Sequence, residues 1–331
     1  IRERLSAIVI GAMLAGWAHY PTEAQATLPP PGCHHLHLNS VDPDAAIAFY
    51  TRQFPTTAKT NWGGFPALRS PNNVLILFSK VASPPPTQPQ TAFWHFGWHV
   101  LDARETLAKF QRQQGVVFLP LYNGDGSDSV LISSDAWPGT GGILGRTREQ
   151  IVEAKATGVE PTKRGGFGYI QGPDNAMIEY AGNQPQERFN HVHMYQEDPF
   201  CAQLWYQQHL DAPLYGRGTD VAIDTCVVER GRDLTYPALE PQGMYRTPSS
   251  SVEFGDVAFM WYMRQGEEPL VPTRGQIYDH VALSVTDLDA WAAKLRGEGV
   301  RFLEEPYKLG GTRAFMIEGP SLEAIELVEV R

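Results

Sequence analysis

Four stretches of the chain begin with alternating apolar and polar residues and continue with the spacing of an amphipathic helix. Alternation with a period of two predicts a strand, and apolar residues three and four apart predict a helix. Each stretch starts at a histidine, and an aspartate follows seven residues later, where its carboxylate can cap the helix. The histidines are His35, His95, His191 and His280, and the aspartates are Asp42, Asp102, Asp198 and Asp287.

Further short apolar runs follow these stretches and predict additional strands. They lie at residues 74–80, 166–171, 176–181, 257–263, 312–319 and 324–330. The repeating unit is therefore a strand, a helix and then three strands. We expect an α+β fold built from four βαβββ modules.

Two of the last strands carry a glutamate near their centre. Glu179 lies seven residues after Gly172, and Glu326 lies seven residues after Gly319. An ionised carboxylate on an inward strand face is costly to bury unless it is paired or bound to a metal. The alternatives are that Glu179 faces solvent or pairs with a nearby arginine.

The first residues have the pattern of a secretory signal peptide. Arg2 and Arg4 precede an apolar run over residues 5–18, and residues 24–26 offer a small-x-small cleavage site. We expect residues 1–26 to be removed and the mature protein to be exported to a bacterial periplasm. A short buried N-terminal helix is the alternative.

Length, composition and charge limit the number of domains and the kinds of partner that the protein can have. A chain of 331 residues suggests two domains, and 31 glycines with 26 prolines indicate many turns and short strands. A net charge of −10 without a long basic run argues against a nucleic-acid partner. Three cysteines allow one disulfide at most, and none of their spacings fits a zinc finger. We expect a small-molecule partner and no membrane contact after signal cleavage. Whether the protein forms a homo-oligomer is left open.

The repeated module resembles the vicinal oxygen chelate (VOC) superfamily, which includes glyoxalase I, bleomycin and fosfomycin resistance proteins and type I extradiol dioxygenases. The resemblance rests on "DHVALSV" and "GPSLEAIEL" in the last module and covers about residues 33–331. Four modules are most similar to the extradiol dioxygenases, in which two modules make each barrel-like half. This implies an N-terminal domain at residues 27–185, with an insertion at 123–165, and a C-terminal domain at 186–331.

The resemblance also implies a metal site, because histidines of first strands and a glutamate of a last strand bind a divalent metal in this superfamily. Carried over by position, the expected ligands are His35, His95 and Glu179 in the N-terminal half, and His191, His280 and Glu326 in the C-terminal half. Two imidazoles and one carboxylate leave open positions for a bidentate substrate at Fe, Mn or Zn. The extradiol dioxygenases keep the metal only in the C-terminal half, whereas both sets look complete here.

Additional histidines share strand faces with the expected ligands. His37 lies on the face of His35, and His99 lies on the face of His95. Either can serve as a further ligand or as an acid-base group, and His193 occupies the same place in module three. The alternative is that they line the cup or hydrogen-bond to other residues.

Tyr169 is a further catalytic candidate. It lies ten residues before Glu179, the separation at which the extradiol pattern places a tyrosine that hydrogen-bonds a substrate hydroxyl. The usual preceding histidine is missing, and a one-residue change in hairpin register would turn Tyr169 away from the cup. Ordinary strand packing is the alternative.

Two functions remain open. The first is an exported metal-dependent enzyme, either a dioxygenase or a lyase or isomerase, acting on a substrate that chelates the metal through vicinal oxygens. Export argues against an Fe(II) dioxygenase, while the four-module length favours one. The second is a metal-free protein of the bleomycin-resistance type that sequesters an aromatic compound in a cup lined by Trp94, Trp98, Trp261 and Tyr262.

Overall fold

The computed structural model describes residues 28–85, 91–119, 122–123, 129–130, 157, 167–182, 184–216, 220–227, 249–263 and 269–330. The predicted signal peptide and nearly all of the predicted insertion lie outside these residues. Among the helices of the described residues, none is both long enough and apolar enough to span a bilayer.

The first two modules follow the predicted order of elements. Module 1 comprises β1 (Gly32–Ser40), α1 (Pro43–Gln53), β2 (Ala58–Trp62), β3 (Phe65–Arg69) and β4 (Leu75–Lys80). Module 2 comprises β5 (Phe93–His99), α2 (Ala103–Gln111), β6 (Phe118–Leu119), β9 (Phe167–Gln171) and β10 (Met177–Ala181). Along the chain, β7 (Tyr122–Asn123) and β8 (Ser129–Val130) come after β6 and before β9, and they pair with each other in a separate small sheet.

The last two modules repeat the pattern with one difference. Module 3 comprises β11 (Arg188–Gln196), α4 (Pro199–Leu210), β12 (Ser249–Phe254) and β13 (Val257–Met263). In place of a third late strand, its described residues contain a single bridge between Leu214 and Val252. Module 4 comprises β14 (Tyr278–Val285), α5 (Leu288–Gly297), β15 (Phe302–Leu309), β16 (Thr312–Glu318) and β17 (Ala324–Glu329). One disulfide, Cys201–Cys226, ties α4 to the end of the short 3₁₀ helix Ile223–Thr225.

The four predicted aspartates all occupy N-cap positions, and three of them cap the helix with their side chains. The carboxylates of Asp42, Asp102 and Asp287 accept hydrogen bonds from first-turn amides at 2.9–3.0 Å, and Asp198 occupies the N-cap position of α4. Each helix begins where the strand pattern ends, and in α1, α2 and α5 the aspartate satisfies an amide that has no partner within the helix, whereas Asp198 makes no such side-chain bond.

The strands form two large sheets. One has the order β15-β16-β17-β14-β1-β4-β3-β2, and the other has the order β12-β13-β11-β5-β10-β9-β6. Modules 1 and 4 therefore share one sheet, and modules 2 and 3 share the other. The prediction that each half of the chain forms its own cup is wrong, because β1 pairs antiparallel with β14 and β5 pairs antiparallel with β11.

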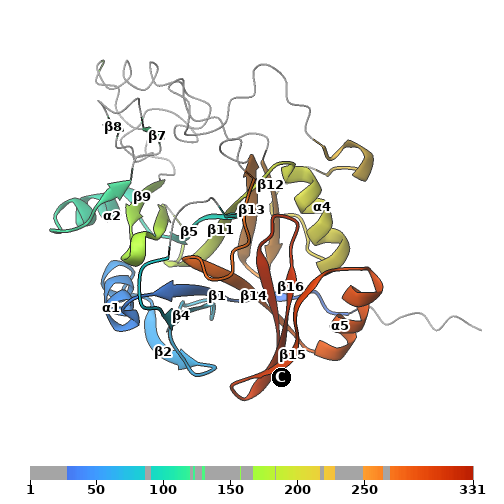
Figure 1. Cartoon of the computed structure of the whole chain (residues 1–331). Helices are drawn as coiled ribbons and strands as arrows, with labels where there is room; N and C mark the ends of the chain where they lie inside the picture. The colour runs from blue at the N-terminus through green and yellow to red at the C-terminus, as the bar shows by residue number, and fades with distance from the viewer. Residues whose placement is uncertain are drawn as a thin grey trace, which may run out of the picture.

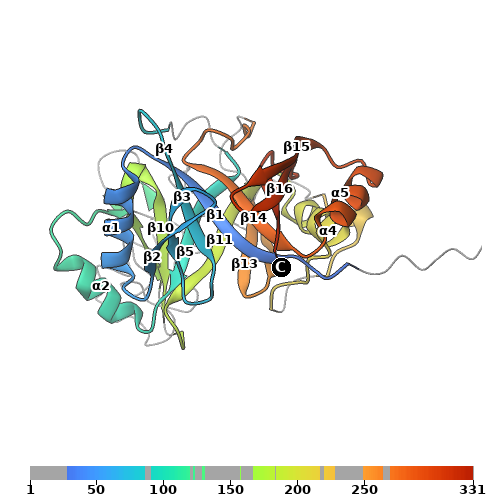
Figure 2. The same ribbon diagram turned by 90° about the horizontal axis from the view of Figure 1, so that it is seen from below.

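The two halves of the chain nevertheless occupy opposite ends of the molecule. Helices α1 and α2 lie at one end, and α4 and α5 lie at the other, in both views (Figures 1 and 2). Each sheet runs from one end to the other, so that every cup contains strands from both halves. Residues close to one another in a cup can thus be more than 200 positions apart in sequence, as His35 and His280 are.

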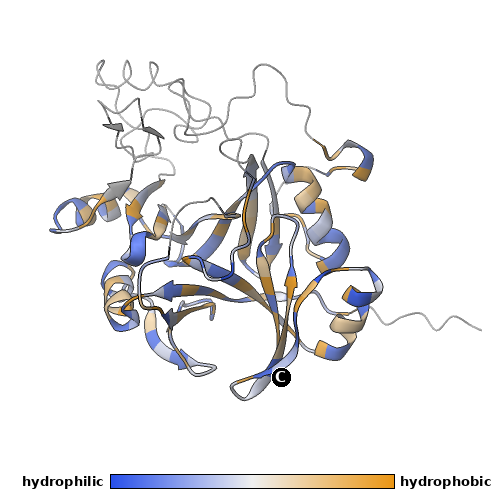
Figure 3. Cartoon of the chain, viewed as in Figure 1, coloured by the Kyte–Doolittle hydropathy of each residue, from blue (hydrophilic) through white to orange (hydrophobic). Residues whose placement is uncertain are grey.

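A continuous apolar core lies beneath the outer helices. In α5, the buried residues Leu288, Trp291 and Leu295 face this core, which matches the mixture of apolar and polar positions along the helix in Figure 3. Trp98 stacks on Phe54 of the segment that ends α1, with ring centroids 4.3 Å apart.

Two of the four aromatic residues expected to line a cup lie elsewhere. Trp98 and Trp261 are fully buried in the core, and Trp261 packs against Tyr206 of α4. The placement of Trp98 in the cup was wrong because it lies three residues after His95, and side chains three apart on a strand point to opposite faces.

Candidate metal centres

Each sheet carries one buried cluster of histidines with a late glutamate. We call His35, His37, His280 and Glu326 the β1–β14 centre, and His95, Glu179, His191 and His193 the β5–β11 centre. All eight side chains are buried. Every one lies on a strand, so the pairing of strands decides which of them meet.

The strand register is the same in both centres. Antiparallel pairing of β5 with β11 places His193 opposite His95 and His191 opposite Gly97, and parallel pairing of β10 sets Glu179 beside Gly97. The other sheet places His37 opposite His280 and His35 opposite Ala282, with Glu326 beside Ala282. The two centres are therefore built from equivalent positions of the repeat.

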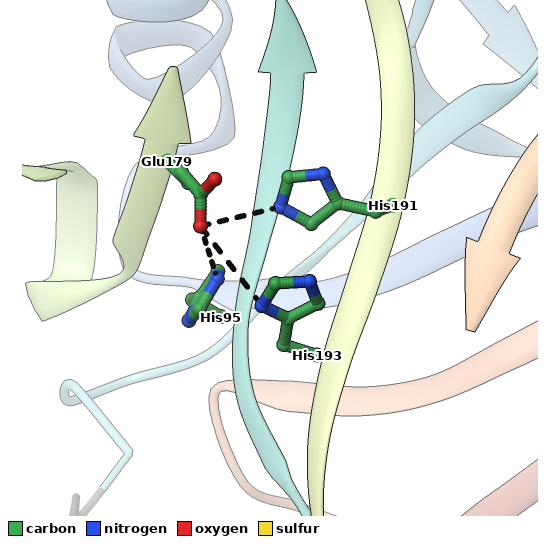
Figure 4. A group of neighbouring side chains, drawn as sticks. All are labelled: His95, Glu179, His191 and His193. Carbon is green, nitrogen blue, oxygen red and sulfur yellow. Dashed lines mark hydrogen bonds and ion pairs between the residues drawn. The ribbon is translucent and has the colours of Figure 1, made fainter. Parts of the chain in front are cut away.

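The β5–β11 centre converges on one carboxylate oxygen. Oε2 of Glu179 lies 2.8 Å from Nε2 of His95, 3.6 Å from Nε2 of His191 and 3.9 Å from Nδ1 of His193. Figure 4 shows the carboxylate on β10 pointing towards the three imidazoles from β5 and β11. The four ligand atoms lie within 4.8 Å of one another.

The β1–β14 centre has a compact triad. Nε2 of His35 lies 3.4 Å from Nε2 of His280 and 3.4 Å from Oε2 of Glu326, and the His280–Glu326 distance between the same atoms is 4.0 Å. His37 completes the set, with its ring centroid 4.6 Å from that of His280. The triad opens into a cavity of about 350 Å³.

The hydrogen bonds of this triad leave three acceptor atoms facing one another. Nδ1 of His280 lies 2.7 Å from Oδ1 of Asp279, and Nδ1 of His35 lies 2.7 Å from Nδ1 of His34. In the tautomer in which His35 donates to His34 and His280 donates to Asp279, both Nε2 atoms are acceptors. Oε2 of Glu326 makes no hydrogen bond within the described residues. Three lone pairs thus converge in a buried space, an arrangement that a cation stabilises.

His191 has the same arrangement in the β5–β11 centre. Its Nδ1 lies 2.8 Å from Oδ1 of Asn190, so it donates there and leaves Nε2 as an acceptor. Nε2 of His191 has no hydrogen-bond partner among the described residues. His193 directs Nε2 to Sδ of Met260 at 3.0 Å, which turns its Nδ1 towards Glu179.

The two glutamates differ in electrostatic environment. Burial tends to raise the pKa of Glu179, but the adjacent His191 and His95 outweigh it and hold that pKa well below the usual value. Burial raises the pKa of Glu326, and the neighbouring His280 and Tyr307 oppose it only partly. Burial, with His280, lowers the pKa of His37 to about 3, so this imidazole is neutral at pH 7.

The donor atoms fit a divalent metal. Metal–ligand bonds of about 2.0–2.2 Å place neighbouring ligand atoms roughly 2.8–3.6 Å apart, whether the ion has six ligands or four. The separations of 3.4, 3.4 and 4.0 Å in the β1–β14 triad are close to this spacing. Imidazole nitrogen with carboxylate oxygen suits Zn, Mn, Fe or Ni rather than Ca or Mg.

Part of the chain matches the model of a known protein family. Residues 188–327 match the family model described as Glyoxalase/Bleomycin resistance protein/Dioxygenase superfamily. This part of the chain belongs to that superfamily. The matched residues contain modules 3 and 4, which stand in different sheets. No curated protein matches the chain.

Solved structures extend the likeness to nearly the whole chain. Glyoxalase I from Zea mays is 17% identical and superposes with a TM-score of 0.58 over 90% of this chain and 92% of that one. Two point mutants of the same protein, also 17% identical, have TM-scores of 0.58 and 0.56. The first covers 91% of this chain and 94% of its own, and the second covers 90% and 92%. The chain therefore has the two-domain fold of the VOC superfamily.

The six predicted ligands all lie in the two clusters, but in different sets. His35 joins His280 and Glu326, whereas His191 joins His95 and Glu179. The predicted sets by chain half are wrong, because β1 pairs with β14 rather than with β5. The composition of two first-strand histidines and one late glutamate in each set is unchanged.

The three catalytic candidates have different surroundings. Tyr169 lies opposite Glu179 in the hairpin, with its ring 4.8 Å from that of His95, so it faces the cup. His37 belongs to the β1–β14 centre. His99 lies at the far end of β5 opposite Arg188 and is outside both groups of ligand atoms. Burial, aided by His191, lowers the pKa of His99 to about 4.

Sequence reasoning missed the residues that orient the ligands. Asn190 and Asp279 each precede a predicted ligand directly and bind its Nδ1. A polar residue immediately before a first-strand histidine was the available signal. Tyr307 on β15, whose hydroxyl donates to Oε1 of Glu326, gave no such signal, because its partner is 19 positions away on another strand.

Proposed function

We propose that this protein is an exported, metal-dependent enzyme that acts on a small organic molecule through two adjacent oxygen atoms of its substrate. The observation that carries the proposal is the triad of His35, His280 and Glu326, whose three acceptor atoms meet beside a cavity of about 350 Å³. The superfamily membership of residues 188–327 and the glyoxalase I fold support the same conclusion.

The metal would be held by these three residues, with His37 as a fourth ligand and third nitrogen donor. When bound, a divalent ion supplies Lewis-acid stabilisation of negative charge that develops on a substrate oxygen. In the β5–β11 centre, His95, Glu179, His191 and His193 would hold a second ion in the same way.

The cavity beside the β1–β14 centre is lined by both apolar and charged residues. Phe65, Leu77, Leu309 and Met316 are the apolar ones, and Arg274 and Glu304 are charged. Arg274 bridges Asp279 at 2.8 Å and Glu304 at 2.9 Å, which fixes its guanidinium beside the cavity. The apolar residues would contact the carbon skeleton of a substrate, while the charged residues would orient its polar groups.

We infer a lyase or isomerase reaction rather than oxygen-dependent ring cleavage. The dioxygenase interpretation drew on a resemblance in which two consecutive modules form each half, whereas both cups here combine distant modules. A metal held at this centre would make the carbon next to a substrate carbonyl more acidic, which favours proton transfer and isomerisation. Zn, Mn or Ni would serve such chemistry in an exported protein without the oxidation that Fe(II) undergoes.

Metal content is the deciding measurement. We expect elemental analysis of the mature protein to give one to two equivalents of a transition metal per chain. The single variants His35→Ala and Glu326→Ala should each lose the metal of the β1–β14 centre. His99→Ala, which changes a residue outside both centres, should keep it. A protein that binds no metal but binds aromatic compounds tightly would instead support sequestration.

The reaction type needs a separate experiment. Proton magnetic resonance in D₂O with a panel of small hydroxyketones should reveal exchange or isomerisation at the carbon beside the carbonyl. The Glu326→Ala variant, which should lose the metal of the β1–β14 centre, should lose this exchange as well, whereas His99→Ala should keep both. Yellow ring-cleavage product from catechol, formed with Fe(II) under anaerobic preparation and then air, would favour the dioxygenase instead.

Export is part of the proposal and rests on the pattern of residues 1–26 alone. Expression of the full chain in a bacterial host should place the protein in the periplasmic fraction, with an N-terminus near Thr27. Retention of residues 1–26 on a cytoplasmic protein would contradict export and leave the metal chemistry unaffected.

A further inference from the structure

The carboxylate of Glu326 presents its two oxygens to different partners. The hydroxyl of Tyr307 on β15 donates a hydrogen bond to Oε1. Oε2 makes no hydrogen bond within the described residues and lies 3.4 Å from Nε2 of His35 and 4.0 Å from Nε2 of His280. One oxygen is thus occupied by a neutral donor, and the other is directed at the ligand cluster.

Tyr307 is held in this place by its own surroundings. Its ring packs against the small buried residues Ala282, Ala314 and Val328, and it pairs with Ala314 across the β15–β16 hairpin. The same side chain lines the cavity of about 350 Å³ beside the centre. The phenol therefore lies between the late carboxylate and the space that a substrate would enter.

The number of oxygens that Glu326 gives to a metal decides how many positions remain open. A carboxylate can bind through one oxygen or through both. With His35, His37 and His280 as the other ligands, binding through both oxygens would leave a six-coordinate ion one open position. Binding through Oε2 alone would leave two, which is the number that a chelating substrate needs.

We propose that Tyr307 is a positioning residue that reserves Oε1 of Glu326, so that the carboxylate binds metal through Oε2 alone and leaves two adjacent positions for a substrate. This inference rests on the proposed metal-dependent function and adds a determinant of substrate chelation to it. Tyr307 acts through Glu326 and is not itself assigned a step in the reaction.

The test separates metal binding from chelation. A full-chain protein carrying His95→Ala and Glu179→Ala retains only the β1–β14 centre and is titrated with Co²⁺, followed by acetohydroxamate, which chelates through two adjacent oxygens. The same titrations are made with Tyr307→Phe added and with Tyr215→Phe added as a control at a tyrosine outside both clusters. Calorimetry gives the affinities, and the visible spectrum of Co²⁺ reports its coordination.

We expect Tyr307→Phe to keep Co²⁺ within a few-fold of the parent affinity while acetohydroxamate binding falls tenfold or more. The Co²⁺ spectrum should change before acetohydroxamate is added, because the carboxylate gains a second bond. Tyr215→Phe should change neither quantity.

Two results would overturn the inference alone. The first is unchanged acetohydroxamate binding in Tyr307→Phe, and the second is a parallel loss of Co²⁺ affinity and melting temperature, which would assign Tyr307 a structural role. If the background protein with His95→Ala and Glu179→Ala bound no Co²⁺ at all, the proposed function of the β1–β14 centre would be overturned together with the inference.

Discussion

The ring of His191 lies directly on the backbone of Gly97. A Cβ atom at Gly97 would come within 2.3 Å of Cε1 and 2.4 Å of Nε2 of His191, and within 3.1 Å of Cβ of Glu179. The equivalent position in the β1–β14 centre is Ala282, whose methyl group stands between His35 and Glu326 in the same register. Only the β5–β11 centre therefore requires glycine at the strand position between its histidine and its glutamate.

Replacement of Gly97 by alanine should displace His191 and weaken the β5–β11 centre selectively. The imidazole is the end of a side chain and can rotate away, so we expect the fold to persist with a loss of about 1–3 kcal/mol of stability. Metal affinity at this centre should fall by at least tenfold, and that of the β1–β14 centre should stay unchanged. Isothermal titration with Zn²⁺ measures both.

Gly311→Ala is the matched control, because a Cβ atom there meets nothing within 4 Å. It should leave both affinities as in the parent protein. If Gly97→Ala bound two equivalents of Zn²⁺ with parent affinities, the close approach of His191 to Gly97 would have no bearing on metal binding.

Sequence periodicity was sufficient to locate the modules and the chemical groups. Alternation placed each histidine on an inward strand face, and the aspartate seven residues later marked the start of each helix. The cost of burying a carboxylate singled out Glu179 and Glu326, both of which lie in the clusters with relative exposures of 6% and 3%.

The grouping of these residues could not be obtained in the same way. Alternation specifies the face on which a side chain lies, but it does not specify which strand edge will pair with which. The edge of β1 pairs with β14 rather than β5, and this choice moved His35 into a cluster with His280. The position of Tyr307 depends on the irregular pairing of β15 with β16, which no local pattern reports.

Asp279 should be a determinant of metal affinity in the β1–β14 centre. The pKa of Asp279 is lowered despite its burial because His280, Arg274 and the amide of Gly275 stabilise the ionised form. An ionised carboxylate at Nδ1 makes His280 a stronger donor at Nε2 than a neutral amide would. We expect Asp279→Asn to lower Zn²⁺ affinity there about 10-fold, measured by competition with a chelating dye.

Asn190→Asp makes the opposite change, because the amide oxygen of Asn190, which accepts from Nδ1 of His191, is replaced by a carboxylate oxygen. It should raise the affinity of the β5–β11 centre by a similar factor. Equal Zn²⁺ affinities in the parent and both variants would show that the partner of Nδ1 does not tune either centre.

Tyr278 should contribute to the contact between the two sheets. Its hydroxyl accepts from the backbone amide of Met177 at 2.7 Å and donates to the carbonyl of the same residue at 3.0 Å. Met177 lies two residues before Glu179, and Tyr278 lies two residues before His280, so the contact connects the strands of both centres. Tyr278→Phe would leave two backbone groups without this partner and should cost about 2 kcal/mol.

Chemical denaturation of the metal-free protein measures that loss, and Tyr215→Phe serves as the control. Metal titration of Tyr278→Phe should in addition show weaker binding at both centres, because each loses a neighbour that holds its strand. A destabilisation below a few tenths of a kcal/mol would mean that water replaces the hydroxyl at Met177.

Glu323 should make the stability of the protein depend on pH between about 4.5 and 7. Burial raises the pKa of this carboxyl to about 7, against an ordinary value of 4.5, although Tyr206 and the amide of Ser321 stabilise the charged form. Between these values the folded protein holds a proton that the unfolded chain has released. Stability is therefore fully present below pH 4.5 and is lost as the pH rises towards 7, by roughly 3 kcal/mol.

Glu323→Gln removes the titrating group while it keeps an acceptor for Tyr206. Denaturation of the metal-free protein at pH 5 and pH 7.5 should show the parent losing stability relative to Glu323→Gln across this interval. Glu305→Gln, at an exposed position, should follow the parent. An identical pH dependence in the parent and Glu323→Gln would show that Glu323 is ionised in the folded protein already at pH 5, and that its contacts with Tyr206 and Ser321 outweigh its burial.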